Sequence, residues 1–542
     1  MVRLRRNTLS VHGFDAFSPG NDEPRTPSRR SRLNVSSLLS LLTRRTSFIF
    51  AAIFVVLTLL LFTPHATSSY QSLTRSHKSR FHLLVPASNS NKDLCRLLLS
   101  SIILNYPVPV LINWDAAETE DPFVQHMRKI SKVLDYLNNF PPQQDDDLVL
   151  MVDGYDIWFQ LPPEILIRRY FDVVKTQSEQ LKSIHGARLA KEKDLYQTVV
   201  FGTDKVCWPN SEEEGGRPAC WAVPQSPVPK YSFGPYEDDT VEDALREPYQ
   251  CRPRWLNSGS VMGPVKDVRA LFEAVAARVQ HHQHGASDQY YFATIWGFQE
   301  FARTRLDPNA TFPDGYALPN LDVEVGDSHK IEHHVTLDYE SALFQPIGFY
   351  DHSLSWLVYD GSIQAGRPES MAASPLDTFE LDEKLKKARP PLSAMSLPTK
   401  EKLNPIYNSL FSGSATLRLK QWHELPLLSN VITKQTSPLL HFMMEKAYRV
   451  KWWERMWFVP YSRDLLRASA TAVDIPIAQK SIEGRRWQAA EGPVLPHDSE
   501  SSEGRRDGAW SDKGAWLSWD GLCQPYDDYI FSGDTGSMYN DG

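Results

Sequence analysis

The stretch LVLMVDGYDIWF, residues 148–159, joins a run of aliphatic residues to two aspartates three positions apart. Because a buried strand excludes an unpaired charge, the apolar run predicts a strand over residues 146–153 that ends at Asp153. Gly154 between the aspartates is typical of a turn. Asp153 and Asp156 are therefore expected where the chain leaves the sheet. In the simplest interpretation they do no more than end a strand.

Strand-like and helix-like runs alternate on both sides of this stretch. Strands are expected over residues 80–87, 108–114, 146–153, 198–204 and 255–265, and helices over residues 92–106, 121–140, 162–175 and 265–280. This alternation predicts an α/β fold, with a mostly parallel sheet covered by helices on both faces. Ligands of such sheets bind outside the carboxyl ends of the strands, where Asp153 and Asp156 are expected.

The N-terminal residues predict a membrane anchor. Residues 1–46 hold nine Arg and no Lys, are rich in Ser and Pro, and are expected to be a disordered basic tail. Residues 47–63, SFIFAAIFVVLTLLLFT, carry no charge and directly follow Arg44 and Arg45. By the positive-inside rule this run is a type II signal anchor, with the tail cytoplasmic and the rest lumenal. A buried core helix is the alternative.

The net charge bears on the class of binding partner, and the cysteines bear on disulfides and on zinc binding. The net charge of −8 argues against nucleic acid as the main partner. Cys207 and Cys220 flank a polar loop that a disulfide can close in an oxidising compartment, and no tight ligand cluster indicates zinc. The five cysteines leave at least one thiol that is free or paired between chains. The HHQH run at 281–284 is interpreted as a solvated face.

Two carboxylates at a strand end suit a divalent cation that holds a nucleotide diphosphate, because they are hard oxygen ligands and leave coordination positions for phosphate. Three further motifs follow LVLMVDGYDIWF: RWLNSGSVMGPV at 254–265, SDQYYF at 287–292 and VTLDYESALFQ at 335–345. In order and character, the four motifs resemble the glycosyltransferase domain of the procollagen lysyl hydroxylases and related collagen galactosyltransferases. The resemblance covers roughly residues 80–350 and a piece near residue 441.

The resemblance implies a GT-A-type, Rossmann-like mixed sheet that binds a UDP-sugar through Mn²⁺ or another divalent cation. Asp153 and Asp156 match the family's metal-binding motif. The family's LNSG element, which lies against the sugar, and its acidic motif, which orients donor or acceptor, are matched by Asn257, Ser258, Gly259, Asp288 and Gln289. The alternatives are a polar strand bulge for the first element and a helix N-cap for Asp288.

The resemblance also implies a late histidine as third metal ligand, and His441 in SPLLHFMMEKAYR is the best match. Lys446 is expected to meet the diphosphate, and Ala87, at the end of the first strand, to contact the donor. The family usually has Asn and Gly just after this histidine, whereas this chain has Met443 and Met444. A buried core histidine is the alternative for His441.

The expected organisation follows from these assignments. Residues 64–79 are a stem, 80–358 a GT-A-like core, 359–420 an insertion or loop, 421–474 the C-terminal part of the catalytic domain, and 475–542 a largely disordered polar tail. An iron and 2-oxoglutarate hydroxylase domain is not expected, because no properly spaced H-x-D and later His follow the core.

The expected function is a metal-dependent hexosyltransferase of the Golgi or endoplasmic reticulum membrane, acting on a glycan or protein acceptor. A catalytically silent lumenal binding or scaffold protein is the alternative. A metal-dependent phosphohydrolase would need a second set of ligands that the sequence does not offer. The sequon at Asn309 is lumenal in this topology, and the one at Asn34 is cytoplasmic and expected to stay bare.

Overall fold

The structure is a computed structural model. It describes residues 77–116, 122–209, 217–281, 287–312, 316, 318–320, 330–359, 380–391, 421–444, 446–470, 476–497 and 505–533. The basic tail, the expected anchor at 47–63 and most of the stem lie outside these residues. Within the described part, no helix combines the length and apolar character needed to cross a bilayer.

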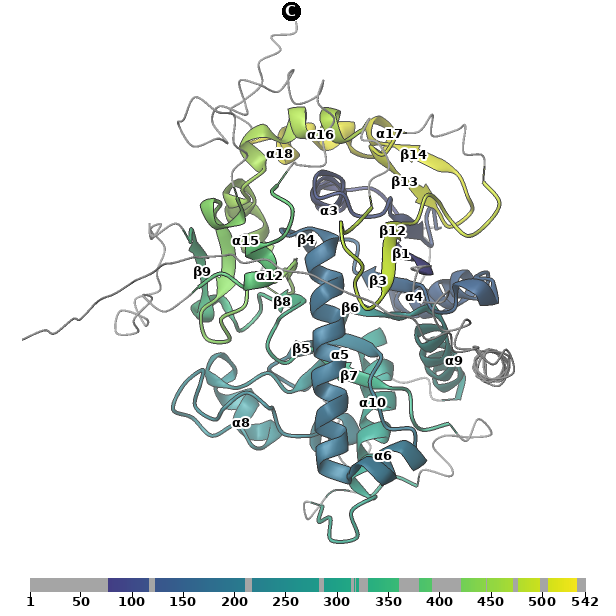
Figure 1. The fold of residues 1–542 in the computed structure, drawn as a ribbon, viewed down its shortest axis with the longest axis vertical. Coiled ribbons are helices and arrows are strands. Elements are labelled where there is room, and N and C mark those ends of the chain that lie inside the picture. Colours follow the sequence, from purple (N-terminus) through teal and green to yellow (C-terminus); the bar gives the residue numbers. More distant parts are fainter. Residues whose placement is uncertain are drawn as a thin grey trace, which may run out of the picture. The chain divides into compact units, whose positions relative to one another are not determined.

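The centre of the fold is a mixed nine-stranded sheet (Figure 1). Its order is β14-β13-β2-β1-β3-β6-β5-β7, and β12 also pairs with β1. Its strands are β1 (His77–Pro86), β2 (Val110–Ile112), β3 (Leu148–Val152), β5 (Val199–Asp204), β6 (Trp255–Pro264), β7 (Val335–Leu337), β12 (Arg485–Ala489), β13 (Gly508–Ser511) and β14 (Trp516–Ser518). β6 runs antiparallel to β3 and β5, and β14 to β13, whereas the other pairings are parallel. The predicted α/β class is confirmed.

Helices cover both faces of this sheet, as the apolar strands require. Alternate residues of β3 enter different clusters: Leu150 packs with one and Met151 with the other. The first cluster draws on α3 (Lys92–Ile103) and α5 (Pro163–His185), and the second on α4 (Pro122–Leu137), α9 (Val265–His281) and α10 (Asp288–Thr304). Each large apolar side chain so buried contributes about 1.5–3 kcal/mol.

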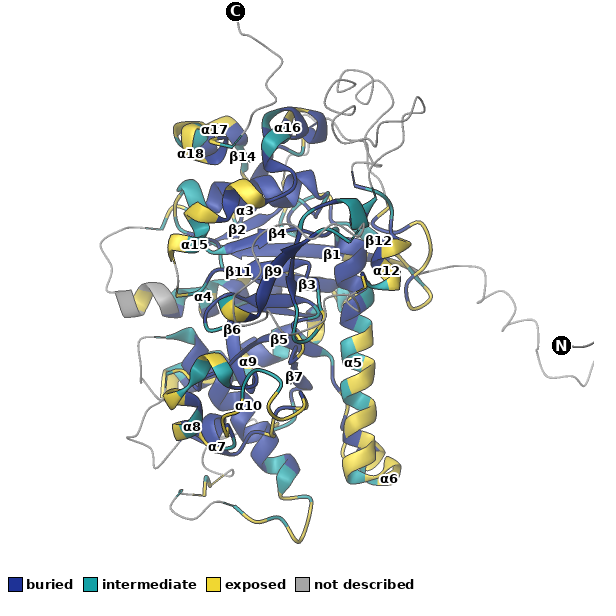
Figure 2. Cartoon of the chain, turned by 90° about the vertical axis from the view of Figure 1, so that its left-hand side faces the viewer, coloured by how far each residue is buried: buried dark blue, intermediate teal, exposed yellow. Residues whose placement is uncertain are grey.

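The remaining helices are short. They are α6 (Ala187–Glu192), α7 (Pro218–Trp221), α8 (Val241–Arg246), α12 (Glu383–Lys386), α15 (Lys446–Lys451), α16 (Ser462–Ala470), α17 (Trp519–Cys523) and α18 (Asp527–Ile530). By contrast, α5 runs past its expected end at residue 175, because no helix breaker precedes Gly186, whose φ is +81°. Its distal part is largely exposed on the outside (Figure 2).

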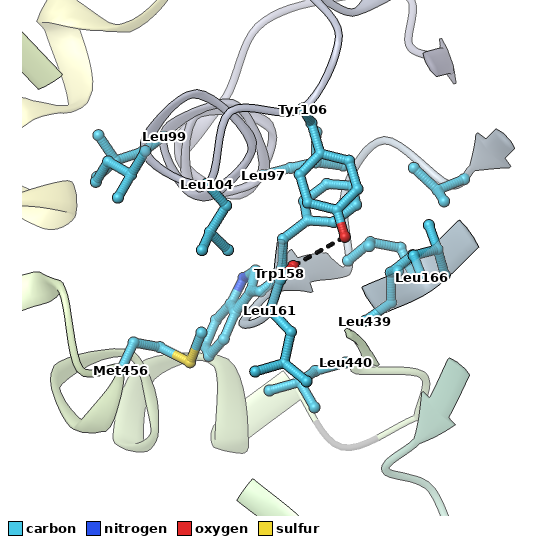
Figure 3. Packing of buried hydrophobic residues seen from close by; sticks show 14 of the residues in the cluster. Leu97, Leu99, Leu104, Tyr106, Trp158, Leu161, Leu166, Leu439, Leu440 and Met456 are labelled. Atoms are coloured by element: carbon cyan, nitrogen blue, oxygen red, sulfur yellow. Dashed lines mark hydrogen bonds between the residues drawn. The ribbon is translucent and has the colours of Figure 1, made fainter. Parts of the chain in front are cut away.

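A second, three-stranded sheet has the order β4-β11-β8, with β4 (Ile157–Phe159), β11 (Leu439–His441) and β8 (Phe344–Pro346). A further pair joins β9 (Leu354–Leu357) to β10 (Leu427–Asn430). Trp158 of β4 is fully buried, 3.9 Å from the ring of Phe442 and 4.9 Å from that of Trp453. Around it, leucines between residues 97 and 166 pack with Leu439 and Leu440 of β11 (Figure 3). The Tyr106 hydroxyl donates a hydrogen bond to the Leu161 carbonyl at 2.9 Å. This core holds β4 against β11.

The C-terminal region departs from the expected polar tail. Residues 476–497 and 505–533 are ordered, and they supply β12, β13 and β14 of the main sheet. Trp487 and Trp510 are buried, and a disulfide joins Cys523 to Cys95 of α3. Scattered aromatic residues and one cysteine therefore anchor a stretch whose mean composition is polar. The expected disulfide between Cys207 and Cys220 is also present.

Candidate metal centre

The strand pairings bring the three expected metal ligands to one place. The Asp153 amide donates to the Gly259 carbonyl at 2.9 Å, which extends the pairing of β3 with β6. Asp156 directly precedes β4, and β4 pairs with β11 in a register that places Ile157 opposite His441. At the end of this strand pair, the Phe442 amide donates a hydrogen bond to the Asp156 carbonyl at 2.7 Å. Asp156 and His441 are therefore neighbours because their strands pair.

One ligand atom from each of Asp153, Asp156 and His441 lies within 4.8 Å of the others. The His441 Nε2 atom is 3.5 Å from the Asp156 Oδ2 atom. A Cβ on Gly259 would lie 2.3 Å from the His441 ring and 3.1 Å from an Asp153 carboxylate oxygen, so only glycine leaves room for this approach. Gly154 is equally confined, since a Cβ there would lie 2.6 Å from the Pro86 carbonyl oxygen.

The residues fit a divalent cation. Asp156 Oδ1 is buried and has no hydrogen-bond partner among the described residues. A buried carboxylate oxygen is costly to leave unpaired, and a cation would satisfy it. Two carboxylates and one imidazole form a donor set for a divalent first-row metal, and the cluster leaves positions for other ligands. The simple strand-end interpretation of the aspartates explains neither the His441 approach nor the unpaired oxygen.

Opposite charges shift the pKa values of two of these residues, and a bound cation would take the place of the His441 proton. Burial alone would lower the pKa of His441, but the Asp156 carboxylate outweighs it and raises that pKa above its usual value. Burial acts to raise the pKa of Asp156, yet His441 and Arg449 hold it below the usual range. For Asp153, burial and the neighbouring Asp156 charge raise the pKa despite a nearby lysine.

That lysine is Lys129 of α4, which the sequence analysis missed. Its Nζ atom lies 2.5 Å from Asp153 Oδ1 and 2.7 Å from Asp288 Oδ2, and its side chain is only 12% exposed. Burial opposes the charged form, but the two carboxylates outweigh burial and raise the pKa of Lys129. The sequence offered no signal, because Lys129 stands among other lysines and arginines of an amphipathic helix.

The LNSG element connects the cluster to α10. The Ser258 hydroxyl donates to Asp288 Oδ2 at 3.2 Å, and the Ser258 amide donates to Gln289 Oε1 at 3.1 Å. The Asn257 Oδ1 atom accepts from the Gly259 amide at 3.0 Å. Ser287 caps α10 by accepting from the Gln289 amide, so Asp288 is not the N-cap and its carboxylate faces Lys129 instead. The structure thus brings these five predicted residues beside the cluster.

Ala87 and Lys446 are placed differently. Ala87 follows β1 at the same sheet edge, where its amide donates to the Ile112 carbonyl at 3.0 Å and its Cβ borders the space beside Gly154. Lys446 begins α15 and is exposed. One turn later, Arg449 approaches the cluster: its NH2 atom is 3.7 Å from Asp156 Oδ2, and its NH1 atom donates to the Tyr155 carbonyl at 2.9 Å.

Met443 and Met444 follow His441 closely in the chain, and Met443 contacts the LNSG element. Met443 accepts from the Asn257 amide group through its sulfur at 3.2 Å. Met444 is 60% exposed and has a φ of +64°, a conformation rare for a side chain of this size. Both side chains border Gly348. Met443 therefore contacts the LNSG element, whereas Met444 is largely open to solvent.

A second group that the sequence analysis missed is Asp204, at the end of β5. It is fully buried, and burial raises its pKa to about 6. Its carboxylate accepts from the Lys205 amide at 2.8 Å and from the Asn257 side chain. Asp204 thus orients Asn257 from behind the cluster. In the sequence, Asp204 is the last residue of an expected strand and has no second acidic residue beside it.

Comparisons with known proteins add no family assignment. No protein-family model and no curated protein matches this chain.

Proposed function

We propose that this protein is a metal-dependent glycosyltransferase of the GT-A type, which transfers a hexose from a UDP-sugar to a glycan or protein acceptor. The observation that carries the proposal is the convergence of Asp153, Asp156 and His441 at the carboxyl edge of the sheet, with Asp156 Oδ1 buried and unpaired. A metal ion that binds a diphosphate needs such a site, in which the protein fills only some of the coordination positions and leaves the others to phosphate oxygens.

The four ordered motifs support the same proposal. Residues of these motifs lie close together in the fold, beside the cluster of Asp153, Asp156 and His441. Asp153, Asp156 and His441 would hold Mn²⁺ or another divalent cation. When bound, the cation supplies positive charge for the diphosphate leaving group of the donor. Asn257 and Asp288 lie next to the ligands and are assigned to the sugar side of the site.

Lys129 gives the site a fixed positive charge. Because it bridges Asp153 and Asp288, it holds the metal ligand and the sugar-side carboxylate in a fixed relation. Arg449 has a similar role on the other side, where it ties the Tyr155 turn to the Phe442 carbonyl. These two cations also offset the repulsion among the clustered carboxylates.

The proposed location is the Golgi or endoplasmic reticulum membrane, with residues 47–63 as the anchor and the sheet in the lumen. The two disulfides in the described residues agree with an oxidising compartment. A nucleotide-sugar transferase with a lumenal site would draw its donor from the lumen.

The test is turnover by the purified full-length protein in detergent, with a panel of UDP- and GDP-sugars, with and without Mn²⁺. We expect one donor to be hydrolysed or transferred only with metal, and Asp156→Asn to lower this rate at least about a hundredfold. The matched control is Asp135→Asn, because Asp135 is a 63% exposed carboxylate on α4. Equal rates in Asp156→Asn and wild type would refute the proposal.

A silent scaffold is the second candidate, and the methionines favour it. Met443 contacts Asn257, and Met444 stands where the family has a small residue. If no donor binds at millimolar concentration with Mn²⁺ present, the scaffold becomes the better account. Met443→Asn/Met444→Gly would then be the variant to examine for regained binding.

A further inference from the structure

A cavity of about 570 Å³ lies away from the metal centre. The distal turns of α5, the last turns of α10 and β7 line it, together with the segment that follows α10. α10 begins at Asp288 beside the cluster and reaches the cavity at Trp296, so at 1.5 Å per residue the two sites are about 12 Å apart along the helix. Its volume is in the range of pockets that hold small ligands.

The lining of this cavity has both polar and apolar groups, and besides the ion-paired Glu300 and Arg303 it includes the ionisable side chains of His185 and Asp307. Neutral amides come from Gln177, Gln180, Gln197 and Gln225. Leu181 and Val335 supply apolar surface. Arg303 brings no free charge, because it pairs with Glu300 at 2.7 Å and with Glu332 at 2.6 Å. Pyranose sugars match such a lining, since their ring faces are apolar and their hydroxyl and acetamide groups bind amides.

The chain itself carries a site for sugars at the edge of this cavity. Asn309, Ala310 and Thr311 form an N-glycosylation sequon, and Ala310 and Thr311 line the cavity. Asn309 is exposed, in a turn held by the bond from its amide to Asp307 Oδ1 at 2.9 Å. The acceptor side chain is therefore accessible at the rim.

We propose that Asn309 carries an N-linked glycan whose first sugars occupy this cavity. The host's enzyme would form the bond from Asn309 Nδ2 to the sugar C1 atom, while the lipid diphosphate of the oligosaccharide donor leaves and the amide loses one proton. The proposal rests on the lumenal location given under the proposed function, and it is independent of the transferase activity. The glycan covers the apolar lining and connects α5 to the segment after α10.

Occupancy is tested by mass spectrometry of the full-length protein from a eukaryotic secretory host. Wild type and Asn309→Gln are compared with Gln479→Asn, which creates the sequon Asn-Lys-Ser over the three exposed residues 479–481. We expect glycan on Asn309 in wild type, and on both positions in Gln479→Asn. Glycan at position 479 with none on Asn309 would overturn the proposal. Glycan at neither position would also overturn it, together with the lumenal location, while Mn²⁺-dependent turnover could still hold.

Seating in the cavity is tested by release of the glycan from the native protein by a glycosidase. The Asn309 glycan should be released more slowly than the exposed glycan of Gln479→Asn. Ser183→Trp should speed the release from Asn309 about tenfold, because residue 183 lines the cavity from an exposed position of α5 and an indole there takes the space of the sugars. Lys182→Trp, exposed on α5 but outside the lining, is the control and should not change it. Equal release from positions 309 and 479, unaffected by Ser183→Trp, would overturn the seating.

Discussion

At the scale of single residues, the candidate metal centre depends on the absence of a side chain at Gly259 as much as on the side chains that surround it. Gly259 has no Cβ, and this lets the His441 ring lie against Asp153. Asp156 contributes an oxygen that no described residue satisfies. Lys129 adds the compensating charge. The site thus combines three features in a small region: space left by Gly259, an unpaired carboxylate oxygen of Asp156 and the largely buried ammonium group of Lys129.

Gly259→Ala should weaken metal binding. The added Cβ would lie 2.3 Å from His441 Cε1, so the ring must move away from the carboxylates. We expect Mn²⁺ affinity to fall at least about tenfold, measured by calorimetry, while the circular dichroism spectrum is retained. Gly202→Ala on neighbouring β5 is the control, because its Cβ would meet atoms only at 3.6 Å or beyond. Unchanged affinity in Gly259→Ala would show that the cation does not bind at this cluster.

Lys129→Met should destabilise the protein in a way that metal reverses. Removing the cation leaves the partly buried carboxylates of Asp153 and Asp288 without it, at a cost of about 1–2 kcal/mol, because solvent reaches Asp153. In urea unfolding, Mn²⁺ should therefore stabilise Lys129→Met more than wild type, because the cation replaces part of the lost charge. Lys132→Met, at a 44% exposed position one turn along α4, should change stability by no more than about 1 kcal/mol. An equal effect of Mn²⁺ on Lys129→Met and wild type would contradict the assigned role of Lys129.

At the scale of elements, the two sheets meet at the turn between β3 and β4. Asp153 directly follows β3 and Asp156 directly precedes β4, so a single turn presents both carboxylates. The β4–β11 ladder then adds His441, and the buried Trp158 holds that ladder in place. The C-terminal strands brace β1 and β2 on the far side of the main sheet. The order of the pairings, rather than any one motif, assembles the site.

The disulfide between Cys95 and Cys523 should be a main clamp on the C-terminal elements. It joins α3 to α17 across a sequence separation of 428 residues. Cys95→Ser/Cys523→Ser should lower the free energy of unfolding by about 2–4 kcal/mol in urea without reductant. Reductant should remove the difference from wild type. The control is Cys251→Ser, since Cys251 is the free buried thiol of the described residues and should not add a reductant-sensitive effect.

At the scale of the whole molecule, the described residues form one folded unit that begins at His77, and the expected anchor precedes it in the sequence. The function proposed above needs that anchor for retention in the secretory pathway and not for the chemistry of the site. The polar regions at 359–420 and 475–542 show why composition alone misleads at this scale. In the first, α12 packs through the buried Leu385, and in the second, three strands complete the sheet.

Residues 47–63 should anchor the protein. We expect full-length protein expressed in eukaryotic cells to stay in the membrane fraction after alkaline carbonate extraction, because the segment is long enough to span a bilayer. A version without residues 1–63 but with a cleavable secretion signal should be released to the medium. In intact microsomes the folded unit should resist added protease. Digestion of the folded unit in sealed vesicles would reverse the proposed topology.

The sequence by itself determined the local features of this protein. The apolar period and the Gly and Asp residues sufficed for the α/β class, for the strand that ends at Asp153, and for the short disulfide loop between Cys207 and Cys220. These features depend on neighbouring residues, whose burial pattern and turn chemistry can be inferred along the chain. The placement of His441 followed from a resemblance and not from local physics.

Only the tertiary structure decided which distant residues meet. Lys129 pairs with Asp153 because α4 packs against the sheet, and Arg449 lies beside Asp156 on the helix that begins with Lys446. Trp487 and Trp510 draw a polar C-terminal region into the main sheet. Such contacts depend on the free energy of packing elements far apart in sequence, and a window of neighbouring residues carries almost no information about that.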